Sequence, residues 1–158
     1  MFGVCLRYAR DRNEADDMAQ DAWIKVFGKL DKVREAATFA GWLRTLTVNC
    51  CLENLRRRRI SVSDDAAARL ADGNEPLPVS LQVSPTAVAS MSADELVAHI
   101  NQLPEGYRLV FNLVALEGYS HKEAADALGI TASTSRSQLT RARDMLQRRL
   151  AQVLSVCL

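Results

Sequence analysis

The residues best suited to binding chemistry in this sequence form a basic stretch near its C-terminal end. Residues 136–149 hold five Arg and one Asp. On a helix, one face of this stretch carries Arg136, Ser137, Thr140 and Arg141. An Arg side chain can donate two hydrogen bonds to a guanine edge, and hydroxyl groups can pair with bases or phosphates. The stretch therefore predicts a helix that reads DNA.

Two short helices joined by a tight turn are expected to position this face. Ser120 and Glu123 have the spacing of a capping box, which marks a helix start. Gly129 follows at a point where a backbone turn with positive φ is favourable. Thr131 or Ser133 can then cap the second, basic helix. This pattern predicts a helix-turn-helix, whose second helix enters the major groove.

A second polar set lies in the N-terminal half of the chain. We expect a helix from about residue 14 to residue 30, and Asp17, Gln20 and Asp21 recur along it at spacings of three and four. That spacing brings the three side chains to one exposed face. Carboxylates and an amide on such a face can pair with Arg donors of a partner.

The aromatic residues of this half are interpreted mainly as core. Base stacking by Trp23 or Trp42 would need an exposed ring beside a basic groove, and core packing is the favoured interpretation for both. Phe27 and Leu30 are likewise expected to face inward on the apolar stripe of their helix.

A third helix is expected from about Thr38 to Arg59. Asn49, Glu53 and Arg56 share one of its faces, and it ends in four consecutive Arg residues. An amide such as that of Asn49 offers both a donor and an acceptor to a base edge. Arginines at the end of the helix can hold phosphates, which gives affinity without sequence reading.

These patterns predict an all-α chain with two small helical domains. Residues 1–59 carry a net charge of +4, residues 60–91 of −3 and residues 92–158 of 0. The middle segment is rich in Pro, Ser, Ala and Asp and lacks sustained periodicity, so it is expected to be a flexible linker. A second capping box, Ser92 to Glu95, opens the C-terminal domain.

The four cysteines indicate no metal site. Cys5, Cys50, Cys51 and Cys157 show no C-x-x-C motif and no metal-ligand spacing. Reduced thiols acting as small hydrophobic groups are the favoured interpretation, and a redox or zinc sensor is the alternative. Neither a metal nor another cofactor is expected.

Several function classes have little support in the sequence. The apolar runs are too short to insert into a membrane and no signal peptide is visible, so we expect a cytoplasmic protein. His99 and His121 belong to unrelated helices, and no nucleophile–base pair or phosphate-binding loop accompanies them. No catalytic residue is expected.

In combination, these blocks resemble the extracytoplasmic-function (ECF) subfamily of bacterial RNA polymerase sigma factors. The resemblance to sigma region 2 is carried by RNEADDMAQDAWIKVF and TFAGWLRTLTVNCCLENLRRRR. The resemblance to region 4 is carried by LPEGYRLVFNLVALEGYSHKEAADALGITASTSRSQLTRAR. The two blocks have the order found in the family, with a linker and no region 3 between them. The region 2 domain, of three-helix type, is expected to be short at its N-terminal end, and the region 4 domain to have four helices.

The resemblance implies a division of labour between the two domains. Residues 1–59 would bind core RNA polymerase and recognise and melt the promoter minus-ten element, and residues 92–158 would bind the minus-thirty-five duplex. It assigns core polymerase binding to Asp17, Gln20 and Asp21. It assigns single-stranded minus-ten DNA to Asn49, Arg56 and Arg57, with the neighbouring arginines on phosphates. It assigns the minus-thirty-five element to Thr131, Ser133, Thr134, Arg136, Ser137, Thr140 and Arg141. An anti-sigma partner is also implied.

Two positions of the expected recognition helix depart from the family pattern. Ser135 occupies a core-facing position where the family prefers Val, and Gln138 stands where Arg is common. The alternative function is a helix-turn-helix regulator that binds operator DNA without becoming a polymerase subunit. That alternative explains residues 92–158. It leaves two blocks of the N-terminal half without a role, the acidic D-x-x-Q-D block at residues 17–21 and the F-x-G-W-L block at residues 39–43.

Overall fold

The computed structural model describes residues 1–32, 36–61 and 92–156, and within these ranges every regular element is helical. The chain divides into two compact units, residues 1–66 and 67–158. We call their described parts the N-terminal module and the C-terminal module. The first two residues of the expected linker belong to a helix of the N-terminal module. The rest of the linker lies outside the described residues.

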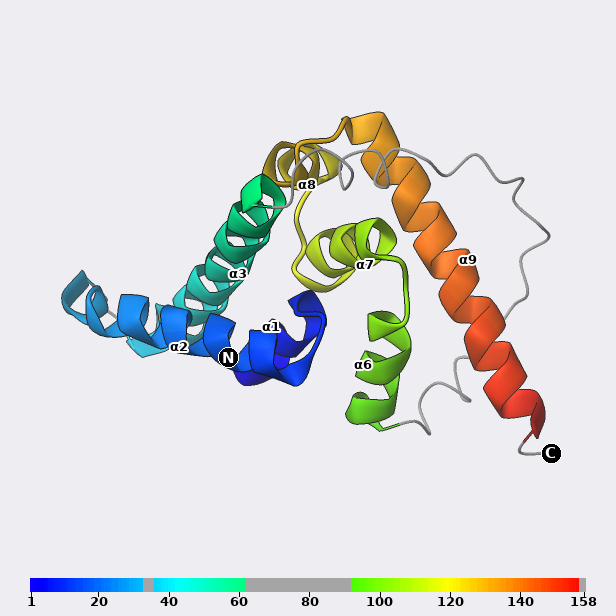
Figure 1. Ribbon diagram of the computed structural model, residues 1–158, viewed down its shortest axis with the longest axis horizontal. Coiled ribbons are helices and arrows are strands. Elements are labelled where there is room, and N and C mark those ends of the chain that lie inside the picture. Colours follow the sequence, from blue (N-terminus) through cyan, green and yellow to red (C-terminus); the bar gives the residue numbers. More distant parts are fainter. Residues whose placement is uncertain (33–35, 62–91, 157–158) are drawn as a thin grey trace. The chain divides into compact units, whose positions relative to one another are not determined.

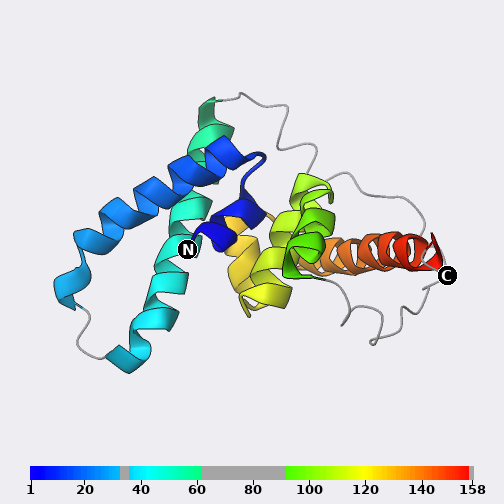
Figure 2. The ribbon, with the colours of Figure 1, turned by 90° about the horizontal axis from the view of Figure 1, so that it is seen from below.

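Three helices build the N-terminal module: α1 (Phe2–Tyr8), α2 (Arg12–Phe27) and α3 (Ala36–Ser61), with a 3₁₀ turn η1 (Leu30–Lys32) after α2. The three α-helices all contact one another, and α2 and α3 lie side by side in both views (Figures 1 and 2). Their shared core contains small residues of α2, which allow α3 to approach closely. Buried residues of this core include Cys5, Tyr8, Ala15, Met18, Ala22, Val26, Leu46 and Cys50.

The bounds of α2 follow from local signals at its two ends. The Asp11 carboxylate accepts a hydrogen bond from the Glu14 backbone N–H at 2.9 Å, so the helix begins at Arg12, two residues before the expected start. It ends at Phe27, before Gly28, rather than continuing to Leu30. Leu30 lies beyond the end of α2, and Phe27 follows Val26, which faces inward. The expected inward positions of Phe27 and Leu30 are therefore wrong, and the two residues are 70% and 46% exposed.

The core interpretation of Trp23 is also wrong. Ala22 and Val26 occupy the inward face of α2, and Trp23 is rotated by about 100° from Ala22 around the helix, so its ring is 46% exposed. Trp42 differs, because it is partly buried against the core cluster that contains Ala22 and Cys50. The core interpretation of Trp42 is confirmed.

The C-terminal module is organised around one long helix. It contains α6 (Ala93–Asn101), α7 (Glu105–Phe111) with the π-helical turn η2 (Asn112–Leu116), α8 (His121–Leu128) and α9 (Ala132–Val156). The helices α6, α7 and α8 all contact α9 (Figure 1). Because α9 is the shared partner, its inward residues Leu139, Ala142 and Leu146 are buried, as the periodicity predicts.

In the helix after Pro104, the most deeply buried apolar residues lie between Leu109 and Leu113. Leu109, Val110 and Leu113 are fully buried, whereas Tyr107 and Phe111 are only partly buried. Truncation of a fully buried Leu typically costs about 2–5 kcal/mol, so Leu109 and Leu113 are major contributors to this core. No described helix is both long enough and apolar enough to cross a membrane.

The turn signals of the helix-turn-helix are confirmed. Ser120 and Glu123 form the reciprocal capping box, with the Glu123 N–H donating to the Ser120 hydroxyl at 3.2 Å and the Ser120 N–H donating to the Glu123 carboxylate at 2.9 Å. Gly129 ends α8 in the left-handed region, with φ of 69°. Thr131, rather than Ser133, caps α9 by accepting from the Thr134 N–H at 3.0 Å.

Replacing Gly129 by Ala should lower the free energy of unfolding of the C-terminal module by about 1–2 kcal/mol, the cost of the left-handed conformation for an L-residue. An added Cβ meets no atom within 4 Å, so the loss would report the backbone alone. Urea unfolding followed by circular dichroism measures the change.

The matched control is Gly41→Ala, inside α3, where an added Cβ also meets nothing within 4 Å. It should stabilise the N-terminal module by about 1 kcal/mol because Ala favours the helix interior. The two tryptophans both lie in that module, so their fluorescence isolates its transition. A Gly129→Ala protein as stable as the wild type would contradict the role of the left-handed turn.

Candidate polymerase and DNA interfaces

The two polar faces of the N-terminal module come from α2 and α3, which run antiparallel. Their opposite directions are visible in three polar links: Glu14 to Arg58, Asp21 to Asn54 and Lys25 to Glu53. The links are spread along α2, and each joins one of its residues to the antiparallel neighbour on α3. The links lie beside the buried apolar core of the two helices and agree with the rotation that this core imposes.

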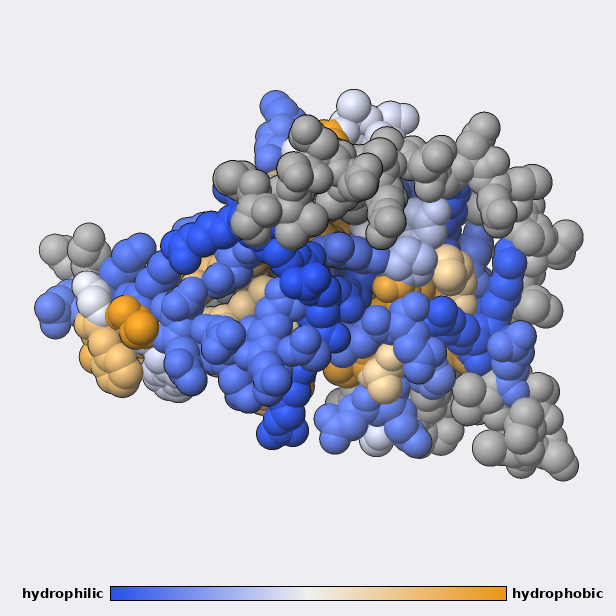
Figure 3. All heavy atoms as spheres, viewed as in Figure 1, coloured by the Kyte–Doolittle hydropathy of each residue, from blue (hydrophilic) through white to orange (hydrophobic). Residues whose placement is uncertain are grey.

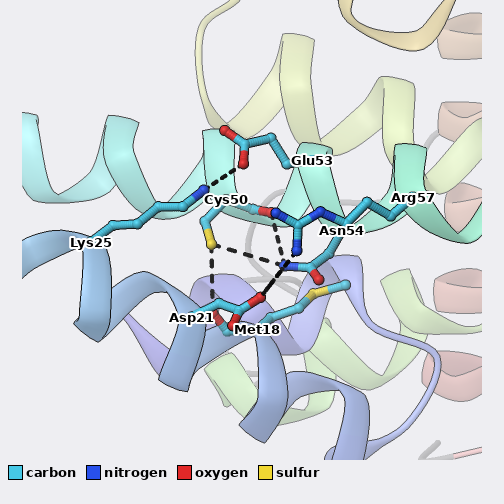
Figure 4. A network of polar contacts seen from close by, with 7 residues as sticks. All are labelled: Met18, Asp21, Lys25, Cys50, Glu53, Asn54 and Arg57. Atoms are coloured by element: carbon cyan, nitrogen blue, oxygen red, sulfur yellow. Dashed lines mark hydrogen bonds and ion pairs between the residues drawn. The ribbon is translucent and has the colours of Figure 1, made fainter.

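The predicted polymerase set is brought together on α2, but its three members differ. Asp17 and Gln20 are exposed, as a docking surface requires. Asp21 is only half-buried and turns toward α3, where its carboxylate accepts a hydrogen bond from the Asn54 amide at 3.1 Å (Figure 4). The Arg57 guanidinium lies 4.0 Å from the same carboxylate oxygen. Asp21 therefore has a contact with α3, whereas Asp17 and Gln20 are exposed to solvent.

Asn54 is a functional neighbour that sequence reasoning missed. Its amide also donates to the Cys50 carbonyl at 3.1 Å, so it ties Asp21 of α2 to the backbone of α3. Asp21 and Asn54 are 33 positions apart, and no local spacing signals such a pairing. Only the packing of the two helices brings them together.

An apolar patch continues the exposed face of α2. We define it by Trp23, Ile24, Phe27 and Leu30, whose exposures are 46%, 70%, 70% and 46%. The rings of Trp23 and Phe27 stack with centroids 5.8 Å apart. Figure 3 shows apolar surface gathered at the C-terminal end of α2. Ile24 lies one helical turn after Gln20, so the patch and the polar set form one continuous surface.

The predicted minus-ten set is solvent-facing on α3. Asn49, Arg56 and Arg57 are all exposed, and the first two share a face with exposed Glu53. The expectation that all four terminal arginines hold phosphates is wrong for Arg58. Its side chain is 15% exposed, and its guanidinium donates to the Glu14 carboxylate at 2.9 Å, so it ties α3 to α2 instead.

The contacts of the Glu14 carboxylate change the pKa of that group. Its partial burial tends to raise the pKa, but hydrogen bonds from the Arg10 backbone N–H at 2.6 Å and from Arg58 outweigh that effect. The pKa of Glu14 is held below its ordinary value of 4.5. The Glu53 carboxylate likewise raises the pKa of Lys25 by accepting its hydrogen bond.

In the C-terminal module the predicted recognition set lies along the first three turns of α9. Arg136, Ser137 and Thr140 are exposed and Arg141 is half-buried. The Ser137 hydroxyl donates to the Thr134 carbonyl at 2.9 Å, and the Thr140 hydroxyl donates to the Arg136 carbonyl at 3.2 Å. In this arrangement both hydroxyl oxygens can still accept from base amino groups, while the arginines can donate.

The start of α9 offers fewer free donors than its three hydroxyl residues suggest. Thr131 and Thr134 pair with each other through their hydroxyls at 2.8 Å, and Thr131 also takes the Thr134 N–H. Ser133 is exposed beside them. The helix N-terminus retains the positive end of the helix dipole, which favours a phosphate.

The two atypical positions of α9 both face inward. Ser135 is fully buried, as expected of a core position, and its hydroxyl lies 3.0 Å from His121 Nδ1 at the start of α8. Gln138 is 4% exposed, so it belongs to the packing of α9 rather than to its DNA-facing side. Farther along α9, Arg149 contacts Gln102 and the His99 carbonyl at the end of α6.

In the described part of the chain, no group of three or more His, Cys, Asp or Glu residues has the arrangement of a metal site. One module presents an acidic and apolar face together with an amide and arginines, and the other presents a basic helix suited to a major groove.

Family models of sigma factors match both modules. Residues 1–60 match Sigma-70 region 2, and residues 93–146 match Sigma-70, region 4. The RNA polymerase sigma-H factor of Pseudomonas aeruginosa is 30% identical over 98% of this chain and 82% of its own length. The ECF RNA polymerase sigma factor SigW of Bacillus subtilis is 26% identical over 95% of this chain and 82% of its own length.

A solved structure has a similar fold. The sigma factor RpoE of Bartonella quintana, crystallised with the anti-sigma factor NepR, aligns with a TM-score of 0.54 and 24% identity. The alignment covers 96% of this chain and 89% of the other. At 24% identity, this similarity is evidence for a shared fold alone.

Replacing Glu14 by Gln should reduce the acid sensitivity of the N-terminal module. Because folding lowers the pKa of Glu14, its stabilising effect is fully present above pH 4.5 and is lost as the pH falls through the folded-state pKa. Urea unfolding followed by tryptophan fluorescence at a series of pH values should show a shallower acid limb for Glu14→Gln than for the wild type. At pH 7, Arg58→Ala should cost about 1–2 kcal/mol.

Asp16→Asn is the matched control, since it removes an exposed carboxylate from the same helix. Its acid limb should follow that of the wild type. An unchanged slope for Glu14→Gln would contradict the contribution of the Glu14–Arg58 ion pair.

Proposed function

The chain belongs to the ECF subfamily of RNA polymerase sigma factors, and from that premise we propose that its two modules divide promoter recognition between them. As a sigma factor it binds core RNA polymerase and directs transcription initiation at specific promoters. The N-terminal module would bind the polymerase and the minus-ten element, and the C-terminal module would bind the minus-thirty-five element. The two family regions, in separate modules with their polar faces exposed, are the observation that carries this proposal.

On α2, Asp17 and Gln20 are proposed to contact core polymerase directly. Asp21 is proposed to contribute from the edge of the interface while it holds Asn54 at 3.1 Å. The apolar patch of Trp23, Ile24, Phe27 and Leu30 extends the same surface, so the partner surface should combine Arg or Lys donors with apolar side chains. A mixed interface of this kind gains orientation from its charges and affinity from its apolar anchors.

On α3, Asn49 is proposed to hold an unstacked base of the minus-ten element. Its exposed amide can pair with a base edge once that base leaves the duplex. Arg56 and Arg57 would hold the phosphates of the same strand, and Arg58 is excluded from this role by its contact with Glu14. Captured bases would then favour the melted state.

On α9, Arg136 and Arg141 are proposed to read the minus-thirty-five element, with Ser137 and Thr140 as acceptors beside them. Thr131, Ser133 and Thr134 would surround a phosphate at the helix start. The minus-thirty-five element would thus be read in its duplex form, by direct base contacts in the major groove.

We propose that the chain itself catalyses no reaction. The free energy for strand opening would come from captured bases and polymerase contacts rather than from nucleotide hydrolysis. The Bartonella structure pairs its sigma factor with an anti-sigma factor. We propose that a partner of that class covers the polymerase-facing surface of α2 here, where an exposed apolar patch needs a cover when polymerase is absent.

Binding of core RNA polymerase to the full chain tests the proposal for α2. Asp17→Asn should weaken the affinity about tenfold, because it removes one charge from the face that would meet basic donors. Phe27→Ala should weaken it by a similar factor without unfolding the module, since its side chain is 70% exposed. Fluorescence anisotropy of the N-terminally labelled chain titrated with core polymerase measures both.

Asp16→Asn removes the same charge one position away and should change the affinity less than about twofold. The loss for Asp17→Asn should shrink at high salt, whereas the loss for Phe27→Ala should persist. Equal effects of Asp16→Asn and Asp17→Asn would contradict the assigned face. Full affinity of Phe27→Ala would remove the apolar patch from the interface.

A further inference from the structure

Two cysteines far apart in the sequence meet in the core of the N-terminal module. Cys5 on α1 and Cys51 on α3 are both fully buried, and their sulfur atoms lie 3.9 Å apart with Cys51 as the donor. They are 46 positions apart, so no spacing rule reveals the pair. The sequence alone favours separate, inert thiols.

The contact makes the two thiols chemically unequal. The hydrogen bond from Cys51 is the largest influence on Cys5 and holds the pKa of its thiol below the ordinary value, against the opposing effect of burial. The same hydrogen bond, with burial, raises the pKa of Cys51. Cys5 is therefore the better nucleophile of the pair, and Cys51 retains the proton that a later step requires.

We propose that Cys5 and Cys51 form a modification site, at which hydrogen peroxide or a small organic hydroperoxide produces an intramolecular disulfide between α1 and α3. The Cys5 thiolate attacks a peroxide oxygen, the O–O bond breaks, and Cys5 becomes a sulfenic acid while the leaving oxygen takes a proton. Cys51 sulfur then attacks Cys5 sulfur, the S–O bond breaks, and the departing oxygen leaves as water with the Cys51 proton.

The step is balanced in atoms and electrons. With hydrogen peroxide, two thiols and one peroxide give one disulfide and two waters, and the two electrons lost by sulfur reduce the peroxide. A disulfide bond is about 2.0 Å long, so the two sulfur atoms must approach by roughly 2 Å. Side-chain rotation and a small shift of α1 toward α3 would have to supply that movement, and the same opening would have to admit the peroxide, because both thiols are fully buried.

Cys50 provides a matched control within the same helix. It is as deeply buried as its neighbour, at 1% exposure, but it belongs to the face of α3 that packs on α2. Its thiol contacts the Met18 carbonyl on α2 at 4.0 Å (Figure 4). Burial is the main influence on Cys50 and raises the pKa of its thiol.

The disulfide would close a long loop of chain and hold α1 against the helix that carries Asn49. A cross-link between distant residues lowers the conformational entropy of the unfolded chain and so stabilises the folded module. The midpoint temperature of thermal unfolding, followed by tryptophan fluorescence, should therefore rise by about 5 °C or more on oxidation. It should return to its starting value when dithiothreitol is added. This inference concerns the N-terminal module alone and does not rest on the proposed roles of its surfaces.

The test uses the full chain with Cys157→Ser, which leaves three thiols. The reduced protein is treated with hydrogen peroxide, blocked with N-ethylmaleimide and digested with trypsin. Mass spectrometry should detect residues 1–7 joined to residues 45–56, and the protein should lose two of its three thiols. Because the second peptide contains both Cys50 and Cys51, the same experiment is repeated with Cys50→Ala and with Cys51→Ala.

The proposal expects the linked peptide in Cys50→Ala and not in Cys51→Ala. The linked peptide in the parent protein and in Cys50→Ala supports it even if the Cys51 variant does not fold. A link through Cys50, loss of thiols to sulfinic acid without a link, or three intact thiols after treatment would each overturn it.

Discussion

The antiparallel packing of α2 against α3 determines which surfaces of the N-terminal module face its partners. Small buried residues such as Ala15 and Ala22 let the helices approach and so set their rotation, and the polar links Glu14–Arg58 and Asp21–Asn54 join the helices beside this core. With that rotation fixed, the acidic and apolar face of α2 and the Asn49 face of α3 point to solvent. A different rotation would bury one recognition surface or the other, so the proposed function depends on this one interface.

The C-terminal module uses a comparable arrangement around a single helix. Three helices pack on α9 and its inward apolar residues are buried, so the opposite side of its first turns faces solvent, where DNA can reach it. The contact between His121 and buried Ser135 links the starts of α8 and α9 one residue before Arg136. Position 135, where the family pattern has the apolar residue Val, is thus occupied here by a Ser that hydrogen-bonds to His121.

Local signals in the sequence predicted much of this architecture. Both capping boxes, the left-handed Gly129 and the inward stripe of α9 follow from short spacings, and all are present. The errors concern long-range packing. Trp23 and Phe27 are large apolar residues of the kind usually found in cores. The inward face of α2 is occupied by their neighbours Ala22 and Val26, so both rings face solvent. Arg58, Asn54 and the Cys5–Cys51 pair acquire their partners only when distant helices meet, so no spacing within one helix could have revealed them.

The most direct test of a two-part promoter reader is transcription from a template library. Core polymerase with this chain transcribes templates whose upstream sequence is randomised, and sequencing of the productive templates reveals what was selected. We expect two separate sequence blocks at a fixed spacing, and Arg136→Ala should degrade the upstream block alone. The Arg149 side chain contacts the end of α6, so Arg149→Ala should degrade neither block. A single selected block, or transcripts that do not require the chain, would contradict it.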